Sequence, residues 1–249
     1  MAGSQTVIEI RQLFQLPEFE EVLRLQQAIW GFADIELLPL RFLVVVTKVG
    51  GHVFGAYDGD MMVGFCFAIP GIKPGGRAYL HSHMLGVLPA YHNAGIGRGL
   101  KLKQRAEALS RGIHLIEWTF DPLELKNAFF NIERLGAIVR RYQENQYGIT
   151  FSPLHGGLPT DRCYAEWWIA SPRVEAILAG DAPPADPSCE MKISYPTDIA
   201  HLRSEDPRRA RQIQKENGAK FRRAFEQGLA VTRFLRGESE GSYLLEPWT

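Results

Sequence analysis

Two histidines stand two positions apart in the sequence, at His81 and His83. On a β-strand, residues at this spacing point to the same face, so both imidazoles can act on one group. Imidazole titrates near pH 6.5, which suits the removal of a proton from an amine. The pair therefore predicts a base or a proton relay. A zinc-binding pair, for which no further ligands stand at motif distance, and a packed structural pair remain the alternatives.

A glycine-rich turn follows the histidines, with glycines at positions 95, 97 and 99. A run typical of a strand, 79–88, precedes it and ends at Pro89. Apolar residues at helical spacing follow it and predict a helix, of which they occupy one face: Leu102, Ala106 and Leu109. The first amides of a helix lack internal partners, and glycines let the backbone approach a phosphate closely. Residues 93–99 are therefore predicted to bind a phosphate or pyrophosphate, with an ordinary glycine-rich bend as the plain alternative.

Two familiar nucleotide-binding motifs do not fit this turn. The dinucleotide fingerprint needs G-x-G-x-x-G and an acidic residue about 20 positions later, in a βαβ unit that opens the fold. Here the glycines read G-x-G-x-G and come after about a third of the chain. The P-loop pattern G-x-x-x-x-G-K-[ST] is absent.

The turn and its strand resemble the pyrophosphate loop of the GNAT superfamily of acyl-CoA N-acyltransferases. In that family Gln/Arg-x-x-Gly-x-Gly/Ala follows a strand that ends in apolar-x-Val-x-Pro. Here residues 85–89 supply the strand end and residues 92–97 the loop, with His92 in place of Gln or Arg. The resemblance covers 7–169 and implies acetyl-CoA or another acyl-CoA as the donor, with no metal.

The resemblance also implies which residues bind the donor. Family members add pantetheine like a strand to a splayed strand edge, and the matching residues here are Met84, Leu85, Gly86 and Val87. The oxyanion donor would be a backbone amide near Leu85. The pyrophosphate would be bound by Asn93, Ala94, Gly95, Ile96, Gly97 and Arg98. Asn127, on the next helix, would reach pantetheine or the CoA phosphate.

The catalytic groups have counterparts in the same family. Residues 81–87 resemble the H-x-H-x-L-x-V of arylalkylamine N-acetyltransferases, in which paired histidines help to remove the amine proton through water. The tyrosine that usually protonates the thiolate stands three residues before Leu-Gly-Phe. Here Ile132 occupies that position, so Tyr142, or alternatively Tyr147, is predicted to replace it; a structural role is the alternative for both.

A loop at 156–162, just before the last core strand, is predicted to form the acceptor pocket. Arg162 offers a bidentate fork for a carboxylate, with an ion pair to Asp161 or Glu166 as the plain alternative. Residues 118–123 and 160–162 are similar to a bacterial branch near the CoA-dependent N-succinyltransferases of amino acids. The prediction is transfer of an acetyl or succinyl group to a small-molecule primary amine. A non-catalytic acyl-CoA-binding or partner-binding module is the alternative.

The composition limits the partners. The 249 residues are 45% hydrophobic and 22% charged, with a formal net charge of zero, so nothing indicates a nucleic-acid or anionic membrane surface. Three scattered cysteines are typical of a reducing cytosol. Residues 1–5 lack signal-peptide features, and no apolar run could span a bilayer. We expect a cytoplasmic protein without nucleic-acid or membrane partners, and a homodimer is left open.

The elements that position these residues follow from periodicity and punctuation. Strands are expected at 7–13, 53–57, 61–69, 79–88, 113–120, 137–142 and 165–169. Helices are expected at 17–30, at 121–135 with Asp121 as its N-cap, and at 40–49, where a β-branched run leaves the type open. This order predicts an α/β (α+β) fold with a GNAT-like, mostly antiparallel mixed sheet flanked by helices.

The predicted domain organisation has three parts. A GNAT-like acyltransferase domain is expected at 1–170 and a proline-rich connector at 171–189. A C-terminal β-α-β-β extension at 190–249 is expected to pack on the core or pair with it. Its helix is opened by Asp206 and Pro207 and ends at Gly228.

Overall fold

A computed structural model of the chain describes residues 7–148, 157–181 and 189–248. The chain divides into two compact units, residues 1–116 and 117–249. The predicted boundaries at 170 and 190 are a different division of the chain and stay a prediction. Part of the connector, 182–188, and part of the acceptor loop lie outside the described residues, as do residues 1–6.

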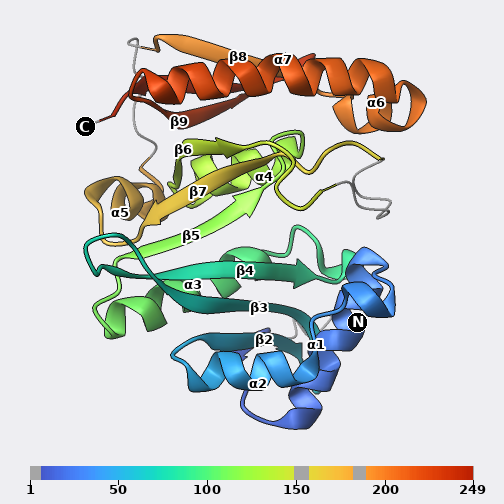
Figure 1. The fold of residues 1–249 in the computed structure, drawn as a ribbon. Helices are drawn as coiled ribbons and strands as arrows, with labels where there is room; N and C mark the ends of the chain where they lie inside the picture. The colour runs from blue at the N-terminus through green and yellow to red at the C-terminus, as the bar shows by residue number, and fades with distance from the viewer. Residues whose placement is uncertain (1–6, 149–156, 182–188, 249) are drawn as a thin grey trace, which may run out of the picture. The chain divides into compact units, whose positions relative to one another are not determined.

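The strands of the first unit lie side by side in chain order (Figure 1). They are β1 (Glu9–Gln12), β2 (His52–Asp58), β3 (Met61–Ile72) and β4 (Ala78–Val87). Every neighbouring pair among these four is antiparallel. The turn between β2 and β3 uses Gly59 at a φ of 57°, so the predicted hairpin is confirmed.

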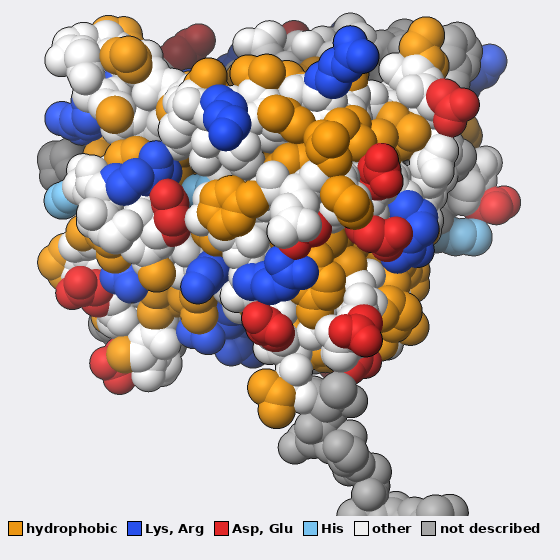
Figure 2. All heavy atoms as spheres, turned by 90° about the horizontal axis from the view of Figure 1, so that it is seen from below, with side chains coloured by type: hydrophobic (Ala, Val, Ile, Leu, Met, Phe, Trp, Pro, Cys, Tyr) orange, Lys and Arg blue, Asp and Glu red, His pale blue; other side chains and the backbone are white. Residues whose placement is uncertain are grey.

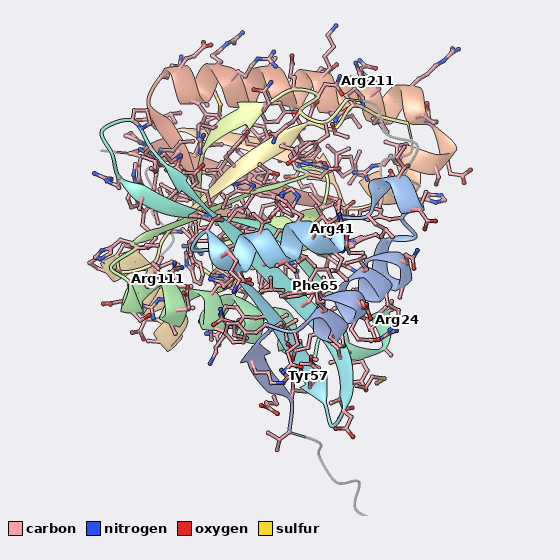
Figure 3. All side chains as sticks on the ribbon, turned by 60° about the horizontal axis from the view of Figure 1, so that its bottom comes forward. Arg24, Arg41, Tyr57, Phe65, Arg111 and Arg211 are labelled. Atoms are coloured by element: carbon pink, nitrogen blue, oxygen red, sulfur yellow. The ribbon has the colours of Figure 1, made fainter. Side chains whose placement is uncertain are left out.

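Three helices cover the two faces of these strands: α1 (Leu16–Trp30), α2 (Leu40–Lys48) and α3 (Ile96–Ser110). A short 3₁₀ turn, η1 (Asp34–Glu36), lies between α1 and α2, and another, η2 (Pro89–Tyr91), lies between β4 and α3. On the α1 and α2 face, Phe65, which Figure 3 labels, is buried in one apolar cluster. Phe67 belongs to the same cluster. On the other face, Phe54 and Leu100 belong to a second cluster, to which α3 contributes. The segment 40–49, whose type the β-branched run leaves open in the sequence, therefore forms a helix, α2.

The helix predicted after the glycine turn is α3. Its covered side carries Ile96, Leu100, Lys101, Gln104 and Ala108, whereas Ala106 is exposed. Two polar side chains on the covered side, Lys101 and Gln104, meet Ser82 of β4. Apolar spacing alone does not indicate this polar contact.

The second unit continues from β5 (Leu115–Phe120), which crosses the boundary between the units. Its strand order is β5-β7-β6-β9-β10-β8. The strands are β6 (Ile138–Gln143), β7 (Arg162–Trp168), β8 (Met191–Pro196), β9 (Leu229–Arg236) and β10 (Glu240–Pro247). Val139 of β6 pairs with Val231 of β9, so the C-terminal extension pairs with the core strands of this unit.

The helices of the second unit include α5 (Pro172–Ala179), α6 (Ile199–Glu205) and α7 (Pro207–Glu226) (Figure 1). Asp206 caps α7 by accepting a hydrogen bond from the Arg209 amide at 3.0 Å, as predicted. The helix α6 was not predicted, so the extension reads β-α-α-β-β. One face of α7 is buried through Phe221 and Gly218.

The predicted helix 121–135 is shorter and irregular. It consists of α4 (Leu125–Phe129) and a π-helical turn, η3 (Phe130–Arg134). The Asp121 carboxylate accepts a hydrogen bond from the Leu123 amide, which closes a local turn before the helix begins. Gly136 has a φ of 81° and ends the element, as predicted.

These elements confirm the predicted class, a mixed α/β fold whose mostly antiparallel strands are flanked by helices. The face drawn in Figure 2 carries both signs of charge intermixed with apolar side chains, in keeping with the zero formal net charge. Within the described residues, no helix has the length and apolar character needed to cross a membrane.

Candidate functional site

The first turn of α3 carries the predicted anion loop. Gly95 is its N-cap residue, at a φ of 79° that glycine adopts without strain, and Asn93 has a φ of 64°. No side chain caps this helix, and within the described residues the amides of Ile96 and Gly97 donate to no protein acceptor. Such amides, at the positive end of the helix dipole, favour an anion.

The rest of the loop is accessible. Asn93, Ala94 and Gly95 are exposed, whereas Gly97 and Arg98 are half-buried. A Cβ added to Gly97 would meet Leu85 at an ordinary distance of 3.5 Å, so the protein itself does not demand glycine there. The loop thus presents backbone amides, rather than side chains, to a ligand.

His92 has a structural contact that the sequence did not indicate. Its Nε2 lies 3.0 Å from the carbonyl oxygen of Val87, the last residue of β4. A carbonyl oxygen only accepts, so the ring nitrogen donates. The residue that replaces Gln or Arg of the family pattern therefore fastens the loop to the end of the strand.

A β-bulge interrupts β4 at the histidines. Phe67 pairs with Met84 and Ala68 pairs with Ser82, so His83 is the extra residue between them. A bulge bends its strand and redirects side chains, and bulges are frequent beside active sites. The predicted pantetheine segment, Met84 to Val87, begins directly after it.

The side chains of this segment alternate between the two helical layers of the unit. Met84 packs against the α1 and α2 cluster, and Leu85 packs against the α3 cluster. A Cβ at Gly86 would lie 2.8 Å from Ile29 and 2.9 Å from Trp30, so glycine is required there by the packing of α1.

The rings of His81 and His83 lie close together, with centroids 5.9 Å apart. His83 also packs on Phe67, at 5.4 Å between ring centroids, while part of its side chain is exposed. Desolvation by the surrounding protein lowers the pKa of His83 below its ordinary value. Within the described residues, no three His, Cys, Asp or Glu side chains gather as a metal site would need.

The predicted acid, Tyr142, is buried in the second unit. Its hydroxyl donates to Asp161 at 2.6 Å, and its ring stacks on Phe221 of α7 at 5.4 Å. Burial, reinforced by nearby Tyr195 and Asp161, raises its pKa. Tyr147, the alternative, is half exposed, and its hydroxyl lies 3.2 Å from Thr119 Oγ1.

Arg162 is buried at the first residue of β7, not in the loop as predicted. Its guanidinium lies over the Tyr147 ring at 5.4 Å and 4.0 Å from the Asp121 carboxylate, and it donates to the Asp161 carbonyl at 3.1 Å. Glu166, one of the predicted ion-pair partners, instead pairs with Arg140 at 2.5 Å. The Arg162 guanidinium thus lies beside the Tyr147 ring, at the end of the predicted acceptor loop.

Arg203 of the C-terminal extension was missed by the sequence reasoning. It is buried and pairs with Asp121 at 3.0 Å and Glu124 at 3.2 Å. Asn127, the predicted CoA contact, is exposed on α4. Asn127, Tyr142 and Arg162 therefore belong to the second unit, whereas the histidines, the pantetheine segment and the anion loop belong to the first.

The fold resembles that of solved acetyltransferases. No protein-family model matches the chain, and no curated protein matches its sequence. A Desulfovibrio desulfuricans protein assigned to the GNAT family superposes with a TM-score of 0.53 and 18% identity, covering 66% of this chain and 100% of its own. The yncA protein of Salmonella typhimurium, solved with its cofactor acetyl-CoA, gives 0.53 and 18%, covering 66% and 97%.

A third structure, the ribosomal-protein-S18-alanine N-acetyltransferase of Escherichia coli, gives a TM-score of 0.52 and 16% identity, covering 66% of this chain and 96% of its own. At these identities the likeness defines the fold. The chain has the fold of GNAT acyl-CoA N-acyltransferases, as predicted, and about a third of it lies outside the likeness.

Proposed function

We propose that the chain is an acyl-CoA-dependent N-acyltransferase that moves an acetyl or succinyl group to the primary amine of a small metabolite or amino acid. The observation that carries this proposal is the uncapped first turn of α3, placed directly after a bulged strand of a GNAT fold. The amides of Ile96 and Gly97, which donate to no protein acceptor among the described residues, would bind a diphosphate of the donor.

The donor would be bound through the backbone of the first unit. Residues Met84 to Val87 would pair with pantetheine as an added strand, and an amide near Leu85 would stabilise the developing oxyanion. Asn127 is proposed to contact pantetheine or the CoA phosphate. Acyl-CoA supplies the electrophilic thioester carbonyl, and the protein supplies orientation and proton transfer.

The proton path would start at the histidine pair. His81 and His83 would take the proton of the attacking ammonium through a water, which leaves the amine free to attack the thioester directly. A lowered pKa keeps His83 neutral, as a base must be, to a lower pH. For return of a proton to the CoA thiolate, Tyr147 fits better than Tyr142, because its hydroxyl is accessible.

The acceptor is proposed to carry a carboxylate beside its amine, which Arg162 would recognise. Its guanidinium is oriented by the Tyr147 ring and by the Asp161 carbonyl. One of its nitrogens also lies 4.0 Å from the Asp121 carboxylate, with which the carboxylate of the acceptor would have to compete. A cytoplasmic location and a homodimer stay predictions.

Calorimetric titration with CoA tests the donor site first. Release of free thiol from acetyl-CoA and succinyl-CoA is then measured against a panel of amines that includes D- and L-amino acids, with mass spectrometry of the products. Turnover on an amino acid, but not on the matching amine without its carboxylate, supports the proposal. Absence of CoA binding at millimolar concentration removes it.

The second candidate is a non-catalytic acyl-CoA-binding module. Two observations favour it. Ile132 is buried at the position where the family has the tyrosine that protonates the thiolate, and the His92 ring donates a hydrogen bond to the Val87 carbonyl. Tight CoA binding with no turnover on any acceptor would select this candidate over the enzyme.

A further inference from the structure

A row of buried polar side chains lies between α3 and the sheet of the first unit. His52 of β2 and Ser82 of β4 both pair with Ala68 of β3, so the three residues stand in one line across the strands. Two of the groups in this row, His52 Nε2 and Gln104 Nε2, are buried without a hydrogen-bond partner among the described residues. The reaction proposed above does not use this row.

The helix α3 covers the row with three polar residues spaced three apart. Lys101 Nζ donates to Ser82 Oγ at 2.8 Å, and Ser82 Oγ donates to Gln104 Oε1 at 2.9 Å. Further along, Glu107 lies 2.8 Å from His52 Nδ1. The Ser82 hydroxyl thus gives its proton to one α3 side chain and accepts from another, which fixes it in one orientation.

Lys101 is an unusual residue for this position. It is only 3% exposed, and Ser82 is equally buried. An amine in such surroundings is expensive to bury, whereas Met or Leu would pack there at no such cost. Its desolvation lowers the pKa of Lys101 to about 7. Packing and stability therefore give no reason for a lysine here.

The location of Ser82 gives a reason. Ser82 directly precedes His83, the extra residue of the bulge, and the pantetheine segment begins one residue later. Lys101 lies in the second turn of the helix whose first turn is the anion loop. The Lys101–Ser82 hydrogen bond is therefore one of the contacts that join the two backbone elements on which the proposed donor site depends.

We propose that Lys101 is a positioning residue for the donor half of the site, because it holds Ser82 and so sets the β4 bulge against the first turn of α3. This inference rests on the proposed acyl-CoA function. Lys101 itself does not touch the donor, since it is buried on the face of the sheet opposite to the histidine pair, which lies toward Phe67. Its effect is transmitted through Ser82.

The test compares Lys101→Met with Lys103→Met, a matched loss of charge at an exposed lysine of the same helix. In Lys101→Met the Kd of CoA and the KM of acyl-CoA rise about tenfold, as for one lost buried hydrogen bond, while the KM of the amine is unchanged. Lys103→Met changes neither. Lys101→Gln, which keeps an N–H donor, restores part of the affinity. Equal affinity in Lys101→Met and Lys103→Met overturns the proposal.

A second readout does not depend on CoA. Hydrogen exchange of the free protein is measured at residues 82–84 and at Gly99, whose amide donates to the Gly95 carbonyl at 2.9 Å. Faster exchange in Lys101→Met, but not in Lys103→Met, means that Lys101 holds these segments; if the wild type then binds no CoA, it is the proposed function that fails. Unchanged exchange overturns the inference. Ser82→Ala, which keeps the lysine, is expected to reproduce the effect, and the double variant to be no worse than either single one.

Discussion

The ring of His92 and the carbonyl of Val87 close a five-residue segment between the end of β4 and the anion loop, with 3.0 Å between Nε2 and the oxygen. The bond lies at the exposed turn that connects β4 to α3.

His92→Ala should loosen this connection and weaken CoA binding. The expected rise in the Kd of CoA is about fivefold, close to the value of one partly exposed hydrogen bond. His92→Gln keeps an N–H donor on a side chain of similar reach and should bind CoA like the wild type. Calorimetry on the three proteins checks this, and equal affinity in all three would mean that the contact has no part in the donor site.

A carboxylate at position 97 should compete with the diphosphate for the amides of α3. Gly97→Asp places an acid in the first turn, where it is favourable to the helix by about 0.3–1 kcal/mol, so the fold is retained. Charge repulsion should weaken CoA binding by about 100-fold or more. Gly97→Ala adds only a Cβ in ordinary contact with Leu85 and should bind CoA normally.

Thermal unfolding and calorimetry of the two Gly97 variants decide this prediction together. If Gly97→Asp is stable and still binds CoA like Gly97→Ala, the first turn of α3 is not the anion site.

Local signals in the sequence predicted the elements of the fold well. Gly31 ends α1 in the left-handed conformation, and Asp206 caps α7 with Pro207 in its first turn, because these residue types act through their own backbone. The strand–loop–helix unit at Gly95 was found for the same reason. Features that depend on distant partners were not found.

Three such features concern the site. Lys101 looks like a solvated residue of a basic helix in the sequence, but in the fold it is buried and donates to Ser82 of β4. The bulge at His83 is a mismatch between two strands and has no signature within either one. The sequence around Tyr142 allows a catalytic role. In the fold its ring is covered by Phe221 of α7, about 80 residues later in the chain, and no local signal predicts this contact.

Removal of either histidine should lower kcat, by about 100-fold if the pair acts as the base. A base works in its neutral form, so kcat should fall as the pH drops through its pKa. Because desolvation lowers the pKa of His83, the acidic limb of the wild type should lie below pH 6.5. In His83→Ala this limb should move or vanish. A wild-type rate that is flat between pH 5 and 8 would exclude the pair as the base.

Replacing each of the two candidate tyrosines by phenylalanine should affect different properties: the stability of the protein for Tyr142 and the catalytic rate for Tyr147. Tyr142→Phe removes a buried donor to Asp161 and should lower the free energy of unfolding by about 1–3 kcal/mol, with little effect on kcat. Tyr147→Phe removes an accessible hydroxyl and should lower kcat with little loss of stability. Denaturant unfolding and steady-state rates measure both. A fall in kcat in Tyr142→Phe, with an unchanged kcat in Tyr147→Phe, would identify Tyr142 as the acid.

Lys101 should make the stability of the wild type depend on pH in the neutral to alkaline range. Burial lowers its pKa from 10.5 to about 7, so between these values the unfolded chain holds a proton that the folded chain lacks. Unfolding then takes up a proton, and the stability of the wild type rises with pH, by up to about 1.4 kcal/mol per pH unit. Below pH 7 both states are protonated, and this contribution is constant.

Lys101→Met lacks this contribution. Cys66 and His52, which interact with the amine, are retained in the variant, as is the ion pair of Glu107 with Arg111 at the end of α3 (Figure 3). The variant should therefore be at least as stable as the wild type at pH 7 and lose that advantage toward pH 10. Guanidinium unfolding at pH 6 to 10 measures the difference, with Lys103→Met as the control. Parallel curves for the wild type and Lys101→Met would mean that the buried amine stays protonated throughout, and that its charge is compensated within the fold.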